Sequence, residues 1–276
     1  MKTLLLFGAI ALSINAFGQV PTYVPTNGLL GWYPFNGNAV DESVNSNDGT
    51  VNGAILTMDR FGNANSAYSF DGIDDFISAN TIFSAGDFTI SLWSKLETST
   101  EPNYLVSQGS DASTGNVSLN YNPISEQFYG GLGLGVINNA IGINSYTVPH
   151  LLWHHIVLTY NSSLLSIYVD GQLIGTKANT NLVNTTVDPL FFGKHISPSF
   201  PYFTSGKLDD IGIWNRALTQ CEIQDLYNAG LGTTSTVTQT GATLTADQTV
   251  ATYQWLDCDD NNSIVNGETN QSYTPT

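Results

Sequence analysis

Short runs of Val, Ile, Tyr, Phe and Thr begin at Leu29, and Gly, Asn, Asp or Pro interrupt them about every ten residues. This spacing is typical of an all-β sandwich, because β-branched and aromatic residues favour extended backbone while turn residues end each strand. In residues 88–94 apolar and small polar side chains alternate up to Trp93, which joins the opposite face. The alternation predicts that Phe88, Ile90 and Leu92 face the core.

One hairpin is predicted directly by its turn. Residues 164–169 and 172–175 flank the dipeptide Asp170-Gly171, which suits a two-residue type I′ turn because glycine adopts positive φ without a side-chain clash. Residues 153–160 precede it as a neighbouring strand. We expect three consecutive antiparallel strands here.

The β-rich region ends in one short predicted helix. Thr219 and Glu222 have the spacing of a capping box, and Gly230 supplies a C-terminal stop. The apolar stripe at helical spacing consists of Ile223, Leu226 and Tyr227.

Five segments, in this order along the chain, carry a family resemblance. They are residues 28–39 (GLLGWYPFNGNA), 67–76 (AYSFDGIDDF), 153–160 (WHHIVLTY), 167–173 (IYVDGQL) and 206–218 (GKLDDIGIWNRAL). Together they resemble the laminin-G-like, concanavalin A-like domains of exported Bacteroidetes proteins. The resemblance implies an antiparallel jelly roll over residues 27–231 that binds glycans or protein partners, often with a calcium ion near the rim. Some relatives with this fold are glycoside hydrolases.

The N-terminus predicts export. Residues 1–18 have one positive charge at Lys2, an apolar run over residues 4–12 and small residues near Gly18, which is the pattern of a signal peptide cleaved near Gly18 or Gln19. Residues 19–26 form an N-terminal lead. Because no later window reaches the ~20 apolar residues of a membrane-spanning helix, we expect a secreted or cell-surface protein.

The net charge limits the possible ligands, and the cysteine count limits the possible disulfides. Seven Lys and Arg against 23 Asp and Glu give a net charge of −16, which argues against nucleic acid as a ligand. The acidic residues are scattered along the chain, and they could either bind a divalent cation or only keep the protein soluble. The two cysteines, Cys221 and Cys258, are expected to remain unpaired, although an exported protein permits a bond between them.

After residue 231 the composition becomes rich in Thr, Ser, Gln and Ala. Residues 232–276 contain one Trp and few other apolar side chains, too few for a separate core. We interpret them as a linker and an incomplete immunoglobulin-like module.

Candidate calcium ligands come from two places. Asn36, Asp41 and Asp48 lie in one oxygen-rich loop, and Asp209 lies on the last long strand. Since the first and last strands of a jelly roll tend to be neighbours, Asp41 and Asp209 could share an ion, with Asp74 from a second acidic turn in reserve.

Each candidate ligand has an alternative explanation. Asx turns account for the loop residues without an ion. If Ile211 and Ile213 face the core, the alternation of a strand places Asp209 on the same face, where backbone N–H groups or Arg216 could satisfy its charge.

No catalytic motif is present, since the chain lacks a Gly-x-Ser-x-Gly elbow, a His-Glu-x-x-His pair and the closely spaced carboxylates of related hydrolases. Exposed aromatic rings are the remaining binding groups, and the candidates are Tyr104, Tyr121, Tyr129, Tyr146 and Tyr202. We therefore expect a non-catalytic recognition or cell-adhesion module that binds carbohydrate or a surface protein with a structural calcium ion. The alternatives are a glycoside hydrolase or polysaccharide lyase of the same fold, and a structural spacer.

Overall fold

The computed structural model describes residues 20–80, 83, 86–109, 116–133, 141–142, 151–178, 188–196 and 202–231, and C-terminal residues 237–240, 242–246, 256–257, 263–265 and 269–274. The predicted signal peptide lies outside the described residues. In the described part of the chain, no helix combines the length and hydrophobicity needed to cross a bilayer.

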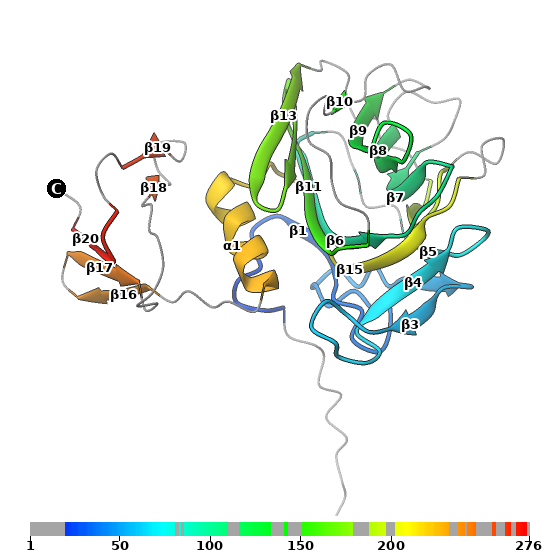
Figure 1. Cartoon of the computed structure of the whole chain (residues 1–276), viewed down its shortest axis with the longest axis horizontal. Helices are drawn as coiled ribbons and strands as arrows, with labels where there is room; N and C mark the ends of the chain where they lie inside the picture. Colours follow the sequence, from blue (N-terminus) through cyan, green and yellow to red (C-terminus); the bar gives the residue numbers. More distant parts are fainter. Residues whose placement is uncertain are drawn as a thin grey trace, which may run out of the picture.

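Two antiparallel sheets form the body of the protein (Figure 1). The eight-stranded sheet consists of β1 (Leu29–Tyr33), β3 (Ile55–Thr57), β4 (Ala67–Asp71), β6 (Phe88–Leu96), β11 (His154–Asn161), β12 (Leu164–Val169), β13 (Gln172–Ala178) and β15 (Ser205–Trp214). Its order is β13-β12-β11-β6-β15-β4-β3, and β1 also pairs with β15. The expected neighbourhood of the first and last long strands is therefore confirmed.

The seven-stranded sheet packs against it. Its strands are β2 (Thr50–Asn52), β5 (Phe76–Ala79), β7 (Asn103–Gln108), β8 (Asn116–Asn122), β9 (Gln127–Gly133), β10 (Ile141–Gly142) and β14 (Leu190–Phe192). Their order is β10-β9-β8-β7-β14-β5-β2. The predicted all-β, two-sheet antiparallel sandwich is confirmed.

The core fills the space between the sheets. Phe88, Ile90 and Leu92 of β6 are at most 2% exposed and belong to the main apolar cluster, as their alternation predicted. Burial of each such side chain contributes about 1.5–3 kcal/mol. Trp93 points to the opposite face of the same sheet, where its ring stacks on Tyr227 at 5.9 Å between centroids.

Helix α1 (Gln220–Gly230) and the N-terminal segment cover that opposite face. A second apolar cluster lies beneath them and consists of Val24, Leu29, Trp32, Val157, Trp214, Leu218, Ile223 and Leu226. The predicted capping box is present, with Glu222 N–H donating to the Thr219 hydroxyl and Thr219 N–H donating to the Glu222 carboxylate. The sandwich therefore has a third, partial layer.

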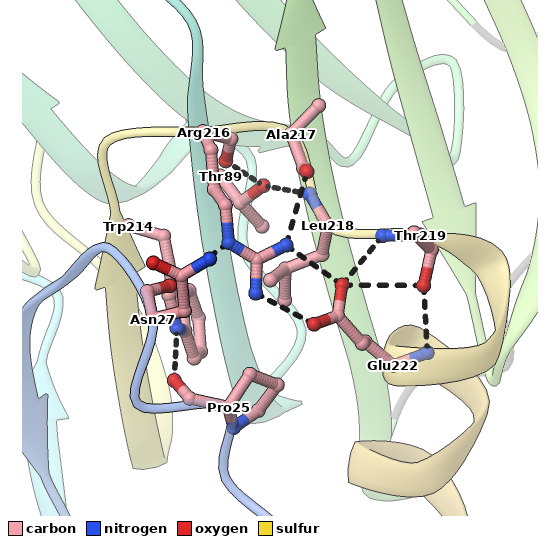
Figure 2. A network of polar contacts seen from close by, with 9 residues as sticks. All are labelled: Pro25, Asn27, Thr89, Trp214, Arg216, Ala217, Leu218, Thr219 and Glu222. Carbon is pink, nitrogen blue, oxygen red and sulfur yellow. Dashed lines mark hydrogen bonds and ion pairs between the residues drawn. The ribbon is translucent and has the colours of Figure 1, made fainter.

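A polar network joins the start of the domain to this helix (Figure 2). Arg216 donates from Nη1 and Nη2 to the Glu222 carboxylate at 2.8 and 2.6 Å, and from Nε to the Asn27 carbonyl at 2.8 Å. The Thr89 hydroxyl of β6 donates to the Arg216 carbonyl and accepts from Leu218 N–H. Three segments distant in sequence are thereby held at one corner.

The predicted hairpin between β12 and β13 is confirmed. Val169 pairs with Gln172, and the two residues between them, Asp170 and Gly171, have φ values of 51° and 76°. Two consecutive positive φ values define the type I′ turn.

The C-terminal part contains β16 (Val237–Thr240), β17 (Thr243–Ala246), β18 (Leu256–Asp257), β19 (Ser263–Ile264) and β20 (Ser272–Tyr273). These strands form a three-stranded and a two-stranded sheet within the described residues, and the immunoglobulin-like assignment stays a prediction. Cys221 of α1 is disulfide-bonded, so the expectation that it is unpaired was wrong. The other cysteine of the sequence, Cys258, lies outside the described residues.

Replacing Glu222 by Gln should lower the free energy of unfolding by about 1 kcal/mol at pH 7, because glutamine keeps the cap but loses the ion pair with Arg216. Burial raises the pKa of Glu222, but hydrogen bonds from Arg216 and Thr219 outweigh it and lower the pKa overall. A lowered folded pKa stabilises the protein above the ordinary glutamate pKa, and this contribution disappears as the pH falls through the folded pKa.

Urea unfolding at pH 7 and pH 3 measures this difference, which should shrink at pH 3. Asp225→Asn is the matched control, because Asp225 lies on the same helix and its pKa is shifted the other way, raised by partial desolvation of its carboxyl and by the charge of Glu222. An equal loss for Glu222→Gln at both pH values would contradict the assignment.

Candidate functional site

Hydrogen bonds within the Asp41 loop account for its shape. Asp41 Oδ1 accepts from the N–H groups of Trp32 and Ser43, each at 2.9 Å. Its Oδ2 accepts from the Ser43 hydroxyl and from Asn47 N–H, also at 2.9 Å. Asp48 Oδ1 accepts from Asp41 N–H at 3.0 Å. Hydrogen bonds of the Asx-turn type thus account for both acids without an ion. In Asp41 each carboxylate oxygen already accepts two hydrogen bonds.

Asp209 binds a guanidinium group. Its Oδ2 lies 2.7 Å from Arg60 Nη1, and the neighbouring Asp210 Oδ2 lies 2.6 Å from Arg60 Nη2. Arg60 Nε also donates to the Gly230 carbonyl at the end of α1. Burial raises the pKa of Asp209 well above its usual range, with the charge of Asp210 acting in the same direction and that of Arg60 opposing both.

A β-bulge reverses the predicted side of Asp209. The register runs from Asp209 opposite Trp93 to Gly212 opposite Ser91, so β15 has one extra residue between these pairs. Asp210 lies within this bulge and has a positive φ of 46°. Asp209 therefore faces the helix side with Trp93, and the prediction that it shares the core face with the isoleucines was wrong because strand alternation fails across a bulge.

The expected calcium ligands Asp41 and Asp209 have different partners. Asp41 is bonded within its loop, Asp209 is bonded to Arg60, and a guanidinium beside a carboxylate repels a second cation. Asn36 and Asp48 are exposed. The reserve residue Asp74 clusters with Asp71 and Asp75, where one ligand oxygen of each lies within 4.8 Å of the others.

A buried Ser-His pair lies on the helix side of β6 and β11. Ser91 Oγ and His155 Nε2 are 2.8 Å apart, and the residues are 2% and 1% exposed. Burial lowers the pKa of His155 to about 3, so its ring is neutral. Because neither group reaches a surface, the pair stabilises packing and does not present a nucleophile.

The outer face of the seven-stranded sheet carries aromatic side chains. Phe76 of β5 and Phe191 of β14 are half-buried, whereas the neighbouring Ile77 and Phe192 are fully buried in the core. Tyr104 of β7 lies on the same outer face, opposite Asn120 of β8. Alternation places Phe76 and Phe191 on this surface. β7 has a bulge after Tyr104, and the pairing of Tyr104 with Asn120, next to the buried Tyr121, places its ring there as well.

A short hairpin after β14 adds two more rings. The chain turns at Gly193, and Lys194 forms an isolated bridge with Phe203. His195 N–H donates to the Tyr202 carbonyl at 2.8 Å. We call Phe76, Tyr104, Phe191, His195 and Tyr202 the aromatic face.

Hydroxyl groups anchor this hairpin to β7. The Ser107 hydroxyl donates to the Lys194 carbonyl at 2.6 Å, and the Thr204 hydroxyl donates to the Tyr104 carbonyl at 2.8 Å. Both anchors join buried side chains to backbone, so they hold the hairpin against the sheet.

The rings contact one another in two groups. His195 packs edge-on against Tyr104, with ring centroids 4.3 Å apart. The rings of Tyr104 and Tyr202 are nearly parallel, with an interplanar angle of 4° and centroids 6.1 Å apart. Phe76 and Phe191 meet edge-to-face at 5.8 Å. Lys194 Nζ lies over this second group, 4.4 Å from the Phe76 centroid and 4.9 Å from that of Phe191.

Two of the five tyrosines proposed from the sequence, Tyr104 and Tyr202, belong to the aromatic face. Tyr129 is half-buried on β9 and bonds to Gln127 and Ser125, Tyr121 is buried in the core, and Tyr146 lies outside the described residues. Sequence reasoning missed Phe76, Phe191, Lys194 and His195. The run Leu190-Phe191-Phe192 holds a signal for Phe191, because a strand places it on the side opposite to its two neighbours.

The chain belongs to the concanavalin A-like lectin/glucanases superfamily, whose family model matches residues 70–224, more than half of the 276-residue sequence. A comparison with curated proteins found no match.

Solved structures share the fold at low identity. Domain 4 of AbnA, a GH43 extracellular arabinanase from Geobacillus stearothermophilus in complex with arabinotriose, has a TM-score of 0.59 and 18% identity, over 72% of this chain and 98% of that domain. The binding domain of Paraclostridial Mosquitocidal Protein 1 has a TM-score of 0.59 and 17% identity, covering 74% and 52%. A mutant Trypanosoma rangeli sialidase with trans-sialidase activity has a TM-score of 0.58 and 22% identity, and the match spans 74% of this chain but only 33% of the sialidase.

Gly193→Ala should destabilise the protein by about 2–4 kcal/mol, because φ is 86° there and an added Cβ would lie 2.5 Å from Phe70 Cδ1. Gly62→Ala is the matched control, since its φ is 87° with nothing within 4 Å of an added Cβ. It should cost only about 1–2 kcal/mol. Urea unfolding measures both, and equal losses would show that the Phe70 contact does not constrain the hairpin.

Proposed function

We propose that this protein is a secreted or cell-surface recognition module that binds carbohydrate on its aromatic face. The observation that carries the proposal is the cluster of Tyr104, His195 and Tyr202 on the outer side of the seven-stranded sheet. Tyrosine rings combine an apolar face with a polar hydroxyl, which suits the C–H faces and hydroxyl groups of a sugar.

Rigidity of the cluster supports binding. The rings come from β7 and from a hairpin anchored to it, so little conformational freedom is lost when a ligand stacks on them. Asn120 lies opposite Tyr104 on the neighbouring strand, where its amide can donate to and accept from sugar hydroxyls. The arabinotriose held by the arabinanase domain shows that a protein of this fold takes an oligosaccharide, and the proposal extends that chemistry to this chain.

Tyr104→Ala and Tyr202→Ala should each weaken binding about fivefold or more, because loss of a stacked ring costs about 1–3 kcal/mol at ring-stacking sites. A glycan array identifies the ligand, and isothermal titration calorimetry on the best hit measures the loss. Phe61→Ala is the control, since Phe61 is a 50% exposed aromatic residue outside the aromatic face. Unchanged affinity in both tyrosine variants would exclude this surface.

Two other outcomes of that screen point elsewhere. New reducing ends or unsaturated products from a polysaccharide would favour the hydrolase or lyase alternative. A blank array together with binding to a surface protein would favour a protein partner, and no binding of either kind would favour a spacer.

Calcium stays a prediction of the family resemblance. Asp71, Asp74 and Asp75 would supply three of the roughly six to eight oxygens that the ion takes. An ion held there should raise the melting temperature on addition of calcium, and Asp74→Asn should remove the shift. A melting temperature unchanged by calcium and by chelator would remove calcium from the proposal.

A further inference from the structure

We propose that Lys194 makes the aromatic face selective for glycans that carry a carboxylate or sulfate group. This inference rests on the proposed function and specifies its ligand class. Cations are scarce in this chain, which has only seven Lys and Arg against 23 Asp and Glu, so the placement of Lys194 is informative.

Lys194 differs from the arginines in its partners. Arg60 and Arg216 both bind carboxylates at 2.6–2.8 Å. Within the residues that the structure describes, Lys194 forms no ion pair, and its ammonium group contacts the rings of Phe76 and Phe191. In a protein of net charge −16, Lys194 is thus a cation that packs on rings and has no ion-pair partner among the described residues, so an external anion can pair with it.

The ammonium group is held in place but keeps hydrogen-bonding capacity. The Ser107 hydroxyl fixes the Lys194 carbonyl, and the bridge to Phe203 fixes the backbone on the other side. The two rings attract the charge electrostatically but accept no conventional hydrogen bond from it. Its N–H groups can therefore donate to carboxylate or sulfate oxygens, and such charge-assisted bonds are stronger than neutral ones.

Lys194 adjoins the tyrosine cluster directly. The next residue, His195, contacts Tyr104. Lys194 and His195 belong to the hairpin whose other strand carries Tyr202. A sugar stacked on the tyrosines can thus extend toward the Phe76–Phe191 pair. The ammonium group would meet a charged substituent on the same or the neighbouring ring.

The overall charge determines how this selectivity acts. A net charge of −16 repels polyanions, but salt at physiological strength screens that repulsion beyond about 8 Å. The contact with Lys194 is local, so it should slow dissociation of the anionic ligand more than it speeds association.

Two matched ligand pairs test the proposal and separate the anion sources. Oligogalacturonate and its methyl ester differ in carboxylate charge, and a carrageenan oligosaccharide and its desulfated form differ in sulfate. Calorimetry should show about tenfold tighter binding of the charged member in at least one pair. Lys194→Met should abolish this preference while leaving the neutral member within about twofold, and Lys194→Arg should retain it.

Lys207→Met is the control. Lys207 of β15 lies opposite Lys95 of β6 in the eight-stranded sheet, and the aromatic face belongs to the seven-stranded sheet. This variant should leave the preference intact. Equal binding of charged and neutral members by the natural protein, or a preference that survives Lys194→Met, would overturn the role of Lys194 alone. Failure to bind any glycan on a broad array would overturn the proposed function together with it.

Discussion

The pairing of β15 with three other strands is the constraint on which the rest of the structure depends. This ten-residue strand pairs with β6 along its length, with β4 at its start and with β1 at its end. Because β1 begins the domain and β15 nearly completes it, this part of the sheet forms only when the two ends of the domain meet. Such long-range pairing has a large entropic cost of closure, and the buried apolar clusters on both faces of the sheet offset it.

The bulge in β15 shows how one extra residue changes the use of neighbouring acids. With Asp210 at positive φ, both Asp209 and Asp210 reach Arg60, which lies over the Trp93 ring and bonds to the end of α1. Removing one member of such a buried set leaves an uncompensated charge, so the three side chains stabilise the structure only together. The guanidinium group supplies the positive charge for which we had expected a metal ion.

The outer faces of the two sheets are covered to different extents. The outer face of the eight-stranded sheet is covered by α1 and the N-terminal segment, so its large aromatic residues are buried. The outer face of the seven-stranded sheet keeps half-buried rings, and a hairpin anchored to β7 adds to them. The proposed binding surface therefore lies on the sheet whose described outer rings are not covered by α1.

The sequence by itself determined the class of the fold, the β12–β13 hairpin and the capped helix, because alternation, turn residues and capping depend on neighbours close in the chain. It also indicated Tyr104 and Tyr202, but it could not separate them from Tyr121, which is buried. The partner of Asp209, the side that it faces and the meeting of Lys194 with Phe76 and Phe191 were decided only by the tertiary structure. The contacts of Asp209 with Arg60 and of Lys194 with Phe76 join residues far apart in the chain. A single bulge or turn, which a periodic pattern does not reveal, also changes which side chains share a face.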